Sequence, residues 1–336
     1  MGTATEIEKA LAGWTAAQYG ADAGVVNLRR LSGGASQETW AFEVASGGRT
    51  DPLILRRAPG GAAAARSSEA ITLATEAALL NATAASGVPV PGVRHVSPPG
   101  SALGEAFIMN RVDGETIGRK ILRDAEFEAA RARLAADCGA ALAGIHAVPL
   151  TGLPELPRSM GRDQIDKYEA IYRGFGLPRP VFELAFAWLK ANEPEPADPV
   201  LVHGDFRLGN LIVDASGLAA VLDWELAHIG DPREDIAWLC TNSWRFGQSE
   251  NRAGGFGQLE DLLAAYSAAG GPAFRPADID WWEILGSLKW GVMCMIMYSA
   301  FKTGADRSVE RAAIGRRVSE TEIDLINLFE GLARHA

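Results

Sequence analysis

The residues best suited to chemistry lie in one stretch near the middle of the chain. Asp205 and Asn210 stand five positions apart in the segment HGDFRLGN, and Asp223 follows after a predicted hairpin. Phosphoryl transfer needs a carboxylate near the attacking hydroxyl and ligands that hold magnesium on the phosphates. Magnesium takes hard oxygen ligands and keeps several waters, so one carboxylate and one amide oxygen are a sufficient protein share. Turn chemistry explains any one of these residues alone, but their order around a hairpin predicts a catalytic acid followed by two metal ligands.

The segment from Leu201 to Leu239 resembles a known family. It carries HGDFRLGN, then DWE at 223–225 and GDP at 230–232. These motifs are similar to those of the aminoglycoside phosphotransferase and choline kinase-like superfamily, whose members are relatives of the protein kinases. The resemblance extends more weakly from the loop at 32–37 to the C-terminal helices, so it covers most of the chain. The wording of the motifs is closest to the branch found alongside acyl-CoA dehydrogenases.

The resemblance implies a role for each residue of the central segment. Asp205 matches the catalytic aspartate that orients or deprotonates the acceptor hydroxyl, and Asn210 and Asp223 match the two metal ligands of the kinases. Arg207 is implied to neutralise phosphate or to anchor an acidic group of the substrate. His203 matches the histidine that opens the loop and is implied to brace it. Residues implied to support this segment are Glu225, Asp231 and Asp235.

The loop between the first two predicted strands is the expected phosphate-binding segment for ATP. Gly33 and Gly34 let backbone N–H groups approach phosphate oxygens because glycine has no Cβ. Ser36 lies in the same loop and is included in the predicted nucleotide site. The loop does not spell GxGxxG, so a Rossmann oxidoreductase is disfavoured. The resemblance implies an adenine-binding hinge between Phe107 and Asp113.

A cation is expected on the strand that follows this loop. Relatives in the family commonly hold a lysine there on the nucleotide phosphates and pair it with a glutamate on a helix. This chain has Leu55, Arg56 and Arg57 at that place. We predict that Arg56, rather than Arg57, faces the nucleotide and pairs with Glu76. Arginine keeps the positive charge of lysine, but its planar guanidinium has a different geometry, so the two residues are not equivalent.

The predicted elements that position these residues divide the chain into two lobes. Strand-like runs occupy 25–31, 39–44, 53–57 and 107–109. A helix is predicted from about Ser67 to Ala85, with the sequence Ser-Ser-Glu as its N-terminal cap. From Asp124 onward the pattern is mainly helical. We therefore predict an α+β, two-lobed, protein-kinase-like fold, with a small antiparallel-sheet N-lobe at 1–112 and a larger, mainly helical C-lobe at 113–336.

The composition of the chain limits the classes of molecule that it is expected to bind. The chain has 336 residues and a net charge of −10, and such an acidic surface disfavours nucleic acid and anionic membranes as primary partners. The three cysteines are far apart and form no CxxC pair, so buried free thiols are expected. The most apolar stretch, 290–301, is too short for a bilayer span and predicts a core helix. The N-terminus has no secretory pattern, and a cytoplasmic location is expected.

The acceptor is the most open question. A small-molecule hydroxyl is predicted, and the branch resemblance implies a hydroxyacyl-CoA or related hydroxy acid as one alternative. A basic mouth would favour that alternative, and an acidic cleft would favour aminoglycoside or choline-like cations. A nucleotide-binding pseudokinase is the alternative of another class. Candidates for the cleft wall are Trp238, Trp244 and Arg245, whereas Trp281, Trp282 and Trp290 are expected in the core. The sequence leaves ATP versus GTP and the oligomeric state open.

Overall fold

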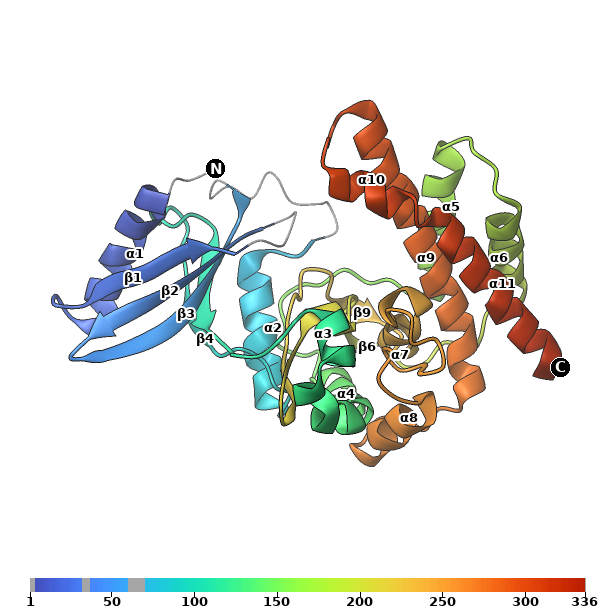
Figure 1. Ribbon diagram of the computed structural model, residues 1–336, viewed down its shortest axis with the longest axis horizontal. Coiled ribbons are helices and arrows are strands. Elements are labelled where there is room, and N and C mark those ends of the chain that lie inside the picture. Colours follow the sequence, from blue (N-terminus) through green and yellow to red (C-terminus); the bar gives the residue numbers. More distant parts are fainter. Residues whose placement is uncertain (1–3, 32–36, 60–69, 336) are drawn as a thin grey trace.

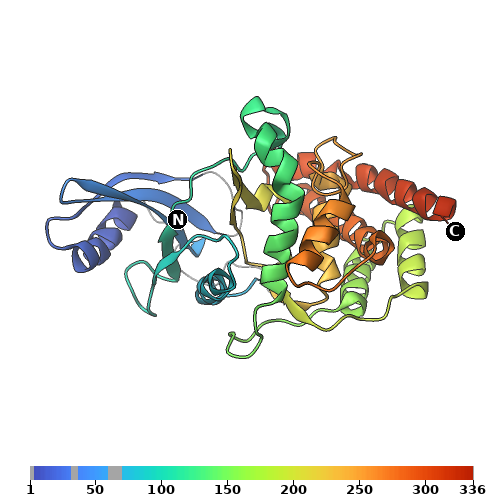
Figure 2. The same ribbon diagram turned by 90° about the horizontal axis from the view of Figure 1, so that it is seen from below.

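The chain folds into two lobes of unequal size. A computed structural model describes residues 4–31, 37–59 and 70–335. Figure 1 shows the small lobe, built on a twisted sheet, beside a larger helical lobe, and Figure 2 shows the same division from below. The sheet has five antiparallel strands in the order β1-β2-β3-β5-β4. The small lobe contains β1 (Gly24–Arg30), β2 (Glu38–Ser46), β3 (Arg49–Arg57), β4 (Val93–Val96), β5 (Ala106–Asn110), α1 (Ala4–Tyr19) and α2 (Leu73–Ala85).

The two faces of the small-lobe sheet have different partners. Phe42, Leu53 and Leu55 point to the outer face, where they pack against Ile7 and Leu11 of α1. The alternate residues, which include Ala41, Ile54 and Met109, belong to a core that continues into α2 and the large lobe. Successive side chains of a strand point to opposite faces. Strand alternation therefore assigns each residue of β3 either to the outer face or to the face that meets the large lobe.

The large lobe is mainly helical and carries two small strand pairs. Its helices are α3 (Gly118–Arg123), α4 (Glu128–His146), α5 (Gly161–Gly174), α6 (Pro180–Ala191), α7 (Arg233–Cys240), α8 (Leu259–Ala268), α9 (Pro276–Thr303), α10 (Val309–Gly315) and α11 (Val318–His335). The strand pairs are β6 (Val200–Val202) with β9 (His228–Gly230), and β7 (Leu211–Asp214) with β8 (Gly217–Val221). The predicted α+β, two-lobed class is confirmed.

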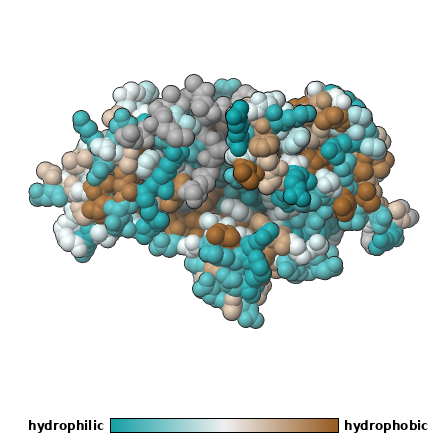
Figure 3. Space-filling view, turned by 45° about the horizontal axis from the view of Figure 1, so that its top comes forward, coloured by the Kyte–Doolittle hydropathy of each residue, from teal (hydrophilic) through white to brown (hydrophobic). Residues whose placement is uncertain are grey.

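Helix α9 is the longest element of the large lobe. It contains the apolar stretch 290–301 but extends over 28 residues. Among the helices of the described residues, α9 alone is long and apolar enough to cross a membrane, and 56% of its apolar window is buried inside the protein. It packs against α5, α6, α7 and α11, so it forms part of the core. On the face seen in Figure 3, hydrophobic residues lie in scattered groups separated by hydrophilic ones.

One predicted boundary in the small lobe was wrong. The helix expected from Ser67 begins at Leu73, and its N-cap is Thr72, whose hydroxyl accepts a hydrogen bond from the backbone N–H of Thr75 at 3.1 Å. Residues 67–69 lie outside the described part of the chain. Several polar residues in succession offered equivalent capping signals, and the sequence alone did not rank them. The predicted lobe boundary at 112 follows the end of β5 at Asn110.

Candidate active site

Residues 203–210 form the predicted catalytic loop, and Asp235 of α7 holds the start of this loop in place. The carboxylate of Asp235, which is fully buried, accepts hydrogen bonds from the backbone N–H groups of His203 at 2.7 Å and Gly204 at 2.9 Å. His203 lies 2.9 Å from the carbonyl oxygen of Leu222 through Nε2 and accepts from the N–H of Asp205 at Nδ1. Burial lowers the pKa of His203, so it is neutral and acts as a brace between the loop and the end of β8.

A close backbone approach also constrains this loop. Gly204 has φ +82°, and a Cβ at this position would lie 2.4 Å from the carbonyl oxygen of Leu226. Only glycine tolerates both the left-handed backbone and this contact. The catalytic loop and the segment after Asp223 are therefore packed directly against each other.

Three donors surround the carboxylate of Asp205. The side-chain amide of Asn210 donates to Oδ2 at 2.6 Å, the indole N–H of Trp238 donates to Oδ1 at 2.7 Å, and Nε of Arg207 donates to Oδ1 at 3.0 Å. The Asp205 side chain keeps 15% of its surface exposed. The carboxylate is thus oriented and accessible, which is what a positioned proton acceptor requires.

The predicted metal ligands lie side by side. The backbone N–H of Leu222 donates to the carbonyl of Asn210 at 2.8 Å, and Asp223 is the next residue. The amide nitrogen of Asn210 is occupied by Asp205, so its Oδ1 is the atom left for a metal. Asp223 has φ +67°, and its side chain is 33% exposed. Each residue therefore offers a hard oxygen, and the two backbone segments that carry them are hydrogen-bonded to each other.

The oxygen ligands that Asn210 and Asp223 offer suit some metal ions and not others. Within residues 4–31, 37–59 and 70–335, no three His, Cys, Asp or Glu side chains converge as a metal cluster. Asn210 and Asp223 therefore do not fit zinc or another metal held by protein groups alone. They do fit magnesium, which completes its coordination with phosphate oxygens and waters.

Arg56 reaches across the lobes to this pair. Its Nη2 lies 2.7 Å from Oδ1 of Asp223 and 3.7 Å from Oε2 of Glu76, and its Nε donates to Oε1 of Gln37 at 2.6 Å. Burial raises the pKa of Asp223, but the charge and hydrogen bond of Arg56 outweigh burial and lower it below its ordinary value. Arg57 lies on the opposite face, where it bonds the carbonyl of Leu103. The structure thus places Arg56, and not Arg57, beside Asp223, one of the two predicted metal ligands.

Gln37 was not assigned a role from the sequence. Its side-chain amide accepts from Arg56 and donates to Glu76 at 2.7 Å and to Glu225 at 3.3 Å. It therefore links the small-lobe cation to the segment after Asp223. Its position directly after the glycine loop was the signal that could have identified it. Gly33, Gly34 and Ser36, which the sequence predicts to bind the nucleotide, lie outside the described residues, and their role stays a prediction.

Arg207, which bonds Asp205, packs against a tryptophan. The guanidinium of Arg207 lies 4.7 Å from the centre of the Trp244 ring. A Cβ on Gly209 would lie 2.3 Å from Nη1 of Arg207, so glycine at this position leaves room for the arginine.

Arg245, which was expected in the wall of the cleft, instead pairs with Glu283 in the interior. That expectation was wrong because Arg245 turns inward to bond the carbonyl of Cys240 at the end of α7.

A buried polar cluster lies behind Trp238. Glu234 accepts from the side-chain amide of Gln164 at 2.6 Å and from Lys289 at 3.1 Å, and it lies 3.0 Å from Nε2 of His228. Burial raises the pKa of Glu234, but His228 and Lys289 outweigh burial and lower the pKa to about 2. Nδ1 of His228 lies 3.0 Å from the carbonyl oxygen of Leu226. This cluster ties α5, α7 and α9 to the segment after Asp223.

Known proteins resemble the chain in sequence and in fold. Acyl-CoA dehydrogenase family member 10 of Mus musculus is 30% identical over 230 residues, which are 65% of this chain; the match spans 20% of the mouse protein. A protein of Ralstonia eutropha JMP134 assigned as an aminoglycoside phosphotransferase superposes with a TM-score of 0.73 at 20% identity, covering 96% of this chain and 98% of the other. A thermostable mutant of aminoglycoside phosphotransferase APH(4)-Ia, in a complex with AMP-PNP and hygromycin B, has a TM-score of 0.59 at 17% identity over 95% and 97% of the chains.

These structures confirm the kinase-like fold, and the mouse relative confirms the predicted similarity to the branch found with acyl-CoA dehydrogenases. The model of the phosphotransferase enzyme family matches residues 27–277, which include Arg56, Asp205, Asn210, Asp223 and Trp238. The chain belongs to the phosphotransferase enzyme family.

Proposed function

We propose that the chain transfers the γ-phosphate of ATP to a hydroxyl group of a small molecule and requires magnesium. The observation that carries this proposal is the convergence of four side chains from both lobes. Asp205, Asn210 and Asp223 come from the large lobe, and Arg56 from the small lobe reaches Asp223 at 2.7 Å. Catalysis of phosphoryl transfer consists mainly of positioning and charge stabilisation, and this group of residues supplies both.

Each residue has a distinct task in the proposed reaction. The Asp205 carboxylate accepts the proton of the acceptor hydroxyl as its oxygen attacks phosphorus, and such a positioned base contributes roughly 10²- to 10⁴-fold in rate. Asn210 Oδ1 and the Asp223 carboxylate hold magnesium, which when bound neutralises the charge of the phosphates. Arg56 binds phosphate oxygens in place of the usual lysine. Its contact with Glu76 keeps the guanidinium directed toward Asp223.

The small lobe offers a place for the adenine ring. A cavity of about 450 Å³ is lined by residues of β1, β2 and the segment after β5, among them Leu28, Ala41 and Arg111. Its size lies within the usual range for small-molecule sites. A family neighbour with the same fold, APH(4)-Ia, was solved with AMP-PNP, which supports nucleotide binding by this fold.

A hydroxyacyl-CoA or related hydroxy acid is the second candidate acceptor, and one observation favours it. The cation of Arg207 lies beside Asp205 and over Trp244, and Arg317 lies 5.8 Å from the neighbouring Trp290 ring. Positive charge next to the phosphate-transfer point suits an acceptor with a carboxylate or phosphate group. The match to acyl-CoA dehydrogenase family member 10 agrees with the branch resemblance from which this class of acceptor was inferred.

A pseudokinase is the competing function of another class. Its motivation is arginine at the position of the usual lysine, but Arg56 lies within reach of both Glu76 and Asp223, and the proposed acid and metal ligands are all present. Catalysis therefore explains more of the site than nucleotide binding alone.

We also propose that the protein is cytoplasmic. Cys138, Cys240 and Cys294 are buried and unpaired with one another, which suits a reducing compartment. Cell fractionation tests this location, and recovery of the protein from an extracellular or membrane fraction would refute it.

The test of function is magnesium-dependent ADP release from ATP with a panel of acceptors. The panel contains an aminoglycoside, choline, a sugar, a hydroxy acid and a hydroxyacyl-CoA thioester. We expect one class to accelerate ADP release, and Asp205→Asn to lower that rate about 10²- to 10⁴-fold while ATP still binds. ATP binding without transfer to any acceptor would favour the pseudokinase. Full activity of Asp205→Asn would remove Asp205 from its role.

A further inference from the structure

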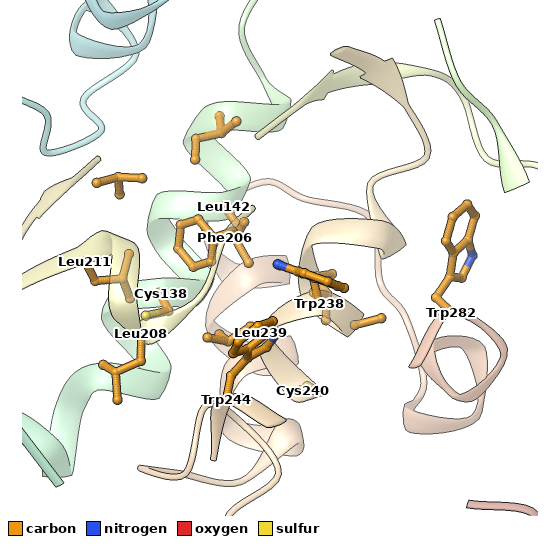
Figure 4. Close-up of a cluster of buried hydrophobic side chains, with 14 of the residues drawn as sticks. Cys138, Leu142, Phe206, Leu208, Leu211, Trp238, Leu239, Cys240, Trp244 and Trp282 are labelled. Carbon is orange, nitrogen blue, oxygen red and sulfur yellow. The ribbon is translucent and has the colours of Figure 1, made fainter. Parts of the chain in front are cut away.

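The indole of Trp238 makes a contact that the proposed reaction does not by itself require. Its N–H donates to Oδ1 of Asp205 at 2.7 Å, from a residue 33 positions later in the chain. Figure 4 shows the indole nitrogen of Trp238 directed toward Phe206, the neighbour of Asp205. Trp238 lies one helical turn after Asp235 on α7, so the two side chains share a face of the helix. One helix therefore holds both the backbone of the catalytic loop and the reacting carboxylate.

The environment of Trp238 restricts the ring to one position. Only 4% of the residue is exposed, and the Trp244 ring centre lies 5.3 Å from its own. The ammonium of Lys289 lies 5.1 Å from the centre of the Trp238 ring and is itself paired with Glu234. A Cβ on Gly286 of α9 would lie 3.5 Å from the ring. The indole cannot turn away from Asp205 without disturbing α9 and this buried ion pair.

Arg207 contacts the same carboxylate oxygen but differs in two respects. Its side chain is 26% exposed, and it carries a positive charge that incoming phosphate or carboxylate groups attract. The indole N–H is neutral and buried, so it does not compete for those anions. Trp238 can therefore hold Asp205 while Arg207 turns toward a bound ligand.

We infer that Trp238 is a positioning residue: its indole N–H fixes the orientation of the Asp205 carboxylate for the acceptor hydroxyl. The inference rests on the proposed function, because it assigns Asp205 the role of proton acceptor. Displacing a reacting group by about 1 Å costs on the order of 10²-fold in rate, and a hydrogen bond to an ionised carboxylate is among the stronger ones in proteins. Loss of the N–H should therefore reduce turnover and leave nucleotide binding unchanged.

The kinetic test uses Trp238→Phe, which keeps an aromatic ring and removes the donor. We expect kcat to fall about 10- to 100-fold, with the Kd for ATP within about threefold of wild type. The matched control is Trp282→Phe on α9, because within the described part of the chain the N–H of Trp282 has no hydrogen-bond partner and its ring lies apart from Trp238 in Figure 4. Equal kcat in the two variants would overturn the inference.

A spectroscopic test separates this inference from the proposed function and needs no acceptor. The indole N–H signal of Trp238, assigned by its loss in Trp238→Phe, should move in Asp205→Asn, because a neutral amide accepts more weakly than a carboxylate. The Trp282 signal should stay in place. An unmoved Trp238 signal would refute the contact itself. A moved signal in a protein that transfers phosphate to no acceptor would instead refute the proposed function.

Discussion

The catalytic loop and the Arg56 cluster meet at Asp223, but they are built in different ways. The loop is held by backbone hydrogen bonds to the fully buried Asp235, all within the large lobe. The Arg56 cluster consists of long side chains from two lobes, joined through Gln37, Glu76 and Asp223. A metal ion bound at Asp223 as proposed would compete with Arg56 for this carboxylate, whereas burial keeps Asp235 away from incoming ligands. The proposed proton acceptor is therefore preorganised, whereas the residues proposed to bind metal and phosphate can exchange partners.

The largest effect should come from removing the support of the loop. Asp235→Ala leaves the N–H groups of His203 and Gly204 buried without their acceptor, and we expect the free energy of unfolding to fall by about 2–5 kcal/mol. Chemical denaturation measures this. The control is Asp113→Ala, whose side chain is 84% exposed and whose change should stay within about 0.5 kcal/mol. Similar stability of the two variants would show that α7 does not brace the loop.

A smaller effect is expected on the phosphate side. Arg56→Ala should raise the Kd for ATP about 10- to 100-fold, because charge-assisted hydrogen bonds to phosphate are lost, while the unfolding transition shifts less than in Asp235→Ala. Isothermal titration with magnesium and ATP measures the binding. Arg57→Ala is the matched control, since Arg57 bonds Leu103 on the other face and should keep the wild-type Kd. The reverse result would show that the inward-facing residue had been misassigned.

A third effect concerns pH and the cluster behind Trp238. Because the folded-state pKa of Glu234 is lowered from 4.5 to about 2, its ionised form stabilises the protein above pH 4.5, and this contribution is lost as pH falls from 4.5 toward 2. Glu234→Gln should therefore be less stable than wild type by about 1–3 kcal/mol near neutral pH, with the difference shrinking as the medium becomes more acidic than the ordinary pKa of glutamate. Thermal unfolding across an acidic-to-neutral pH series tests this.

The control for the pH series is Glu250→Gln, at an exposed position. It should keep wild-type stability within about 0.5 kcal/mol at every pH. A Glu234→Gln difference that stays constant across the range would contradict the assigned ionisation of the cluster.

Local patterns predicted much of the site. The order of Asp205, Asn210 and Asp223 around a hairpin is a property of residues close together in the chain, and β7 and β8 form that hairpin. Strand alternation alone was enough to place Arg56 and Arg57 on opposite faces of the sheet. The start of α2 was less predictable, because neighbouring polar residues compete as caps and the structure uses Thr72.

Other features depend on contacts that no local pattern records. Trp238 was identified only as a candidate wall residue, Gln37 was not assigned at all, and Arg245 turned inward to Glu283. The partners of these three side chains lie 33, 39 and 38 positions away in the chain, respectively. Periodicity reports which face of an element is apolar, but it does not report which element packs against that face.

The sequence by itself determined the two-lobed α+β fold and the family, and it predicted Asp205, Asn210, Asp223 and Arg56 as members of the proposed site. These follow from residue types, short spacings, strand and helix periods, and the resemblance of the central segment to a known family. Only the tertiary structure decided how those residues are held: that Asp235 and Trp238 reach the same loop from one helix face, and that Arg56 meets Asp223 across the lobes. The physical reason is that such contacts join residues far apart in sequence, and they form only when packing of the two lobes brings the elements together.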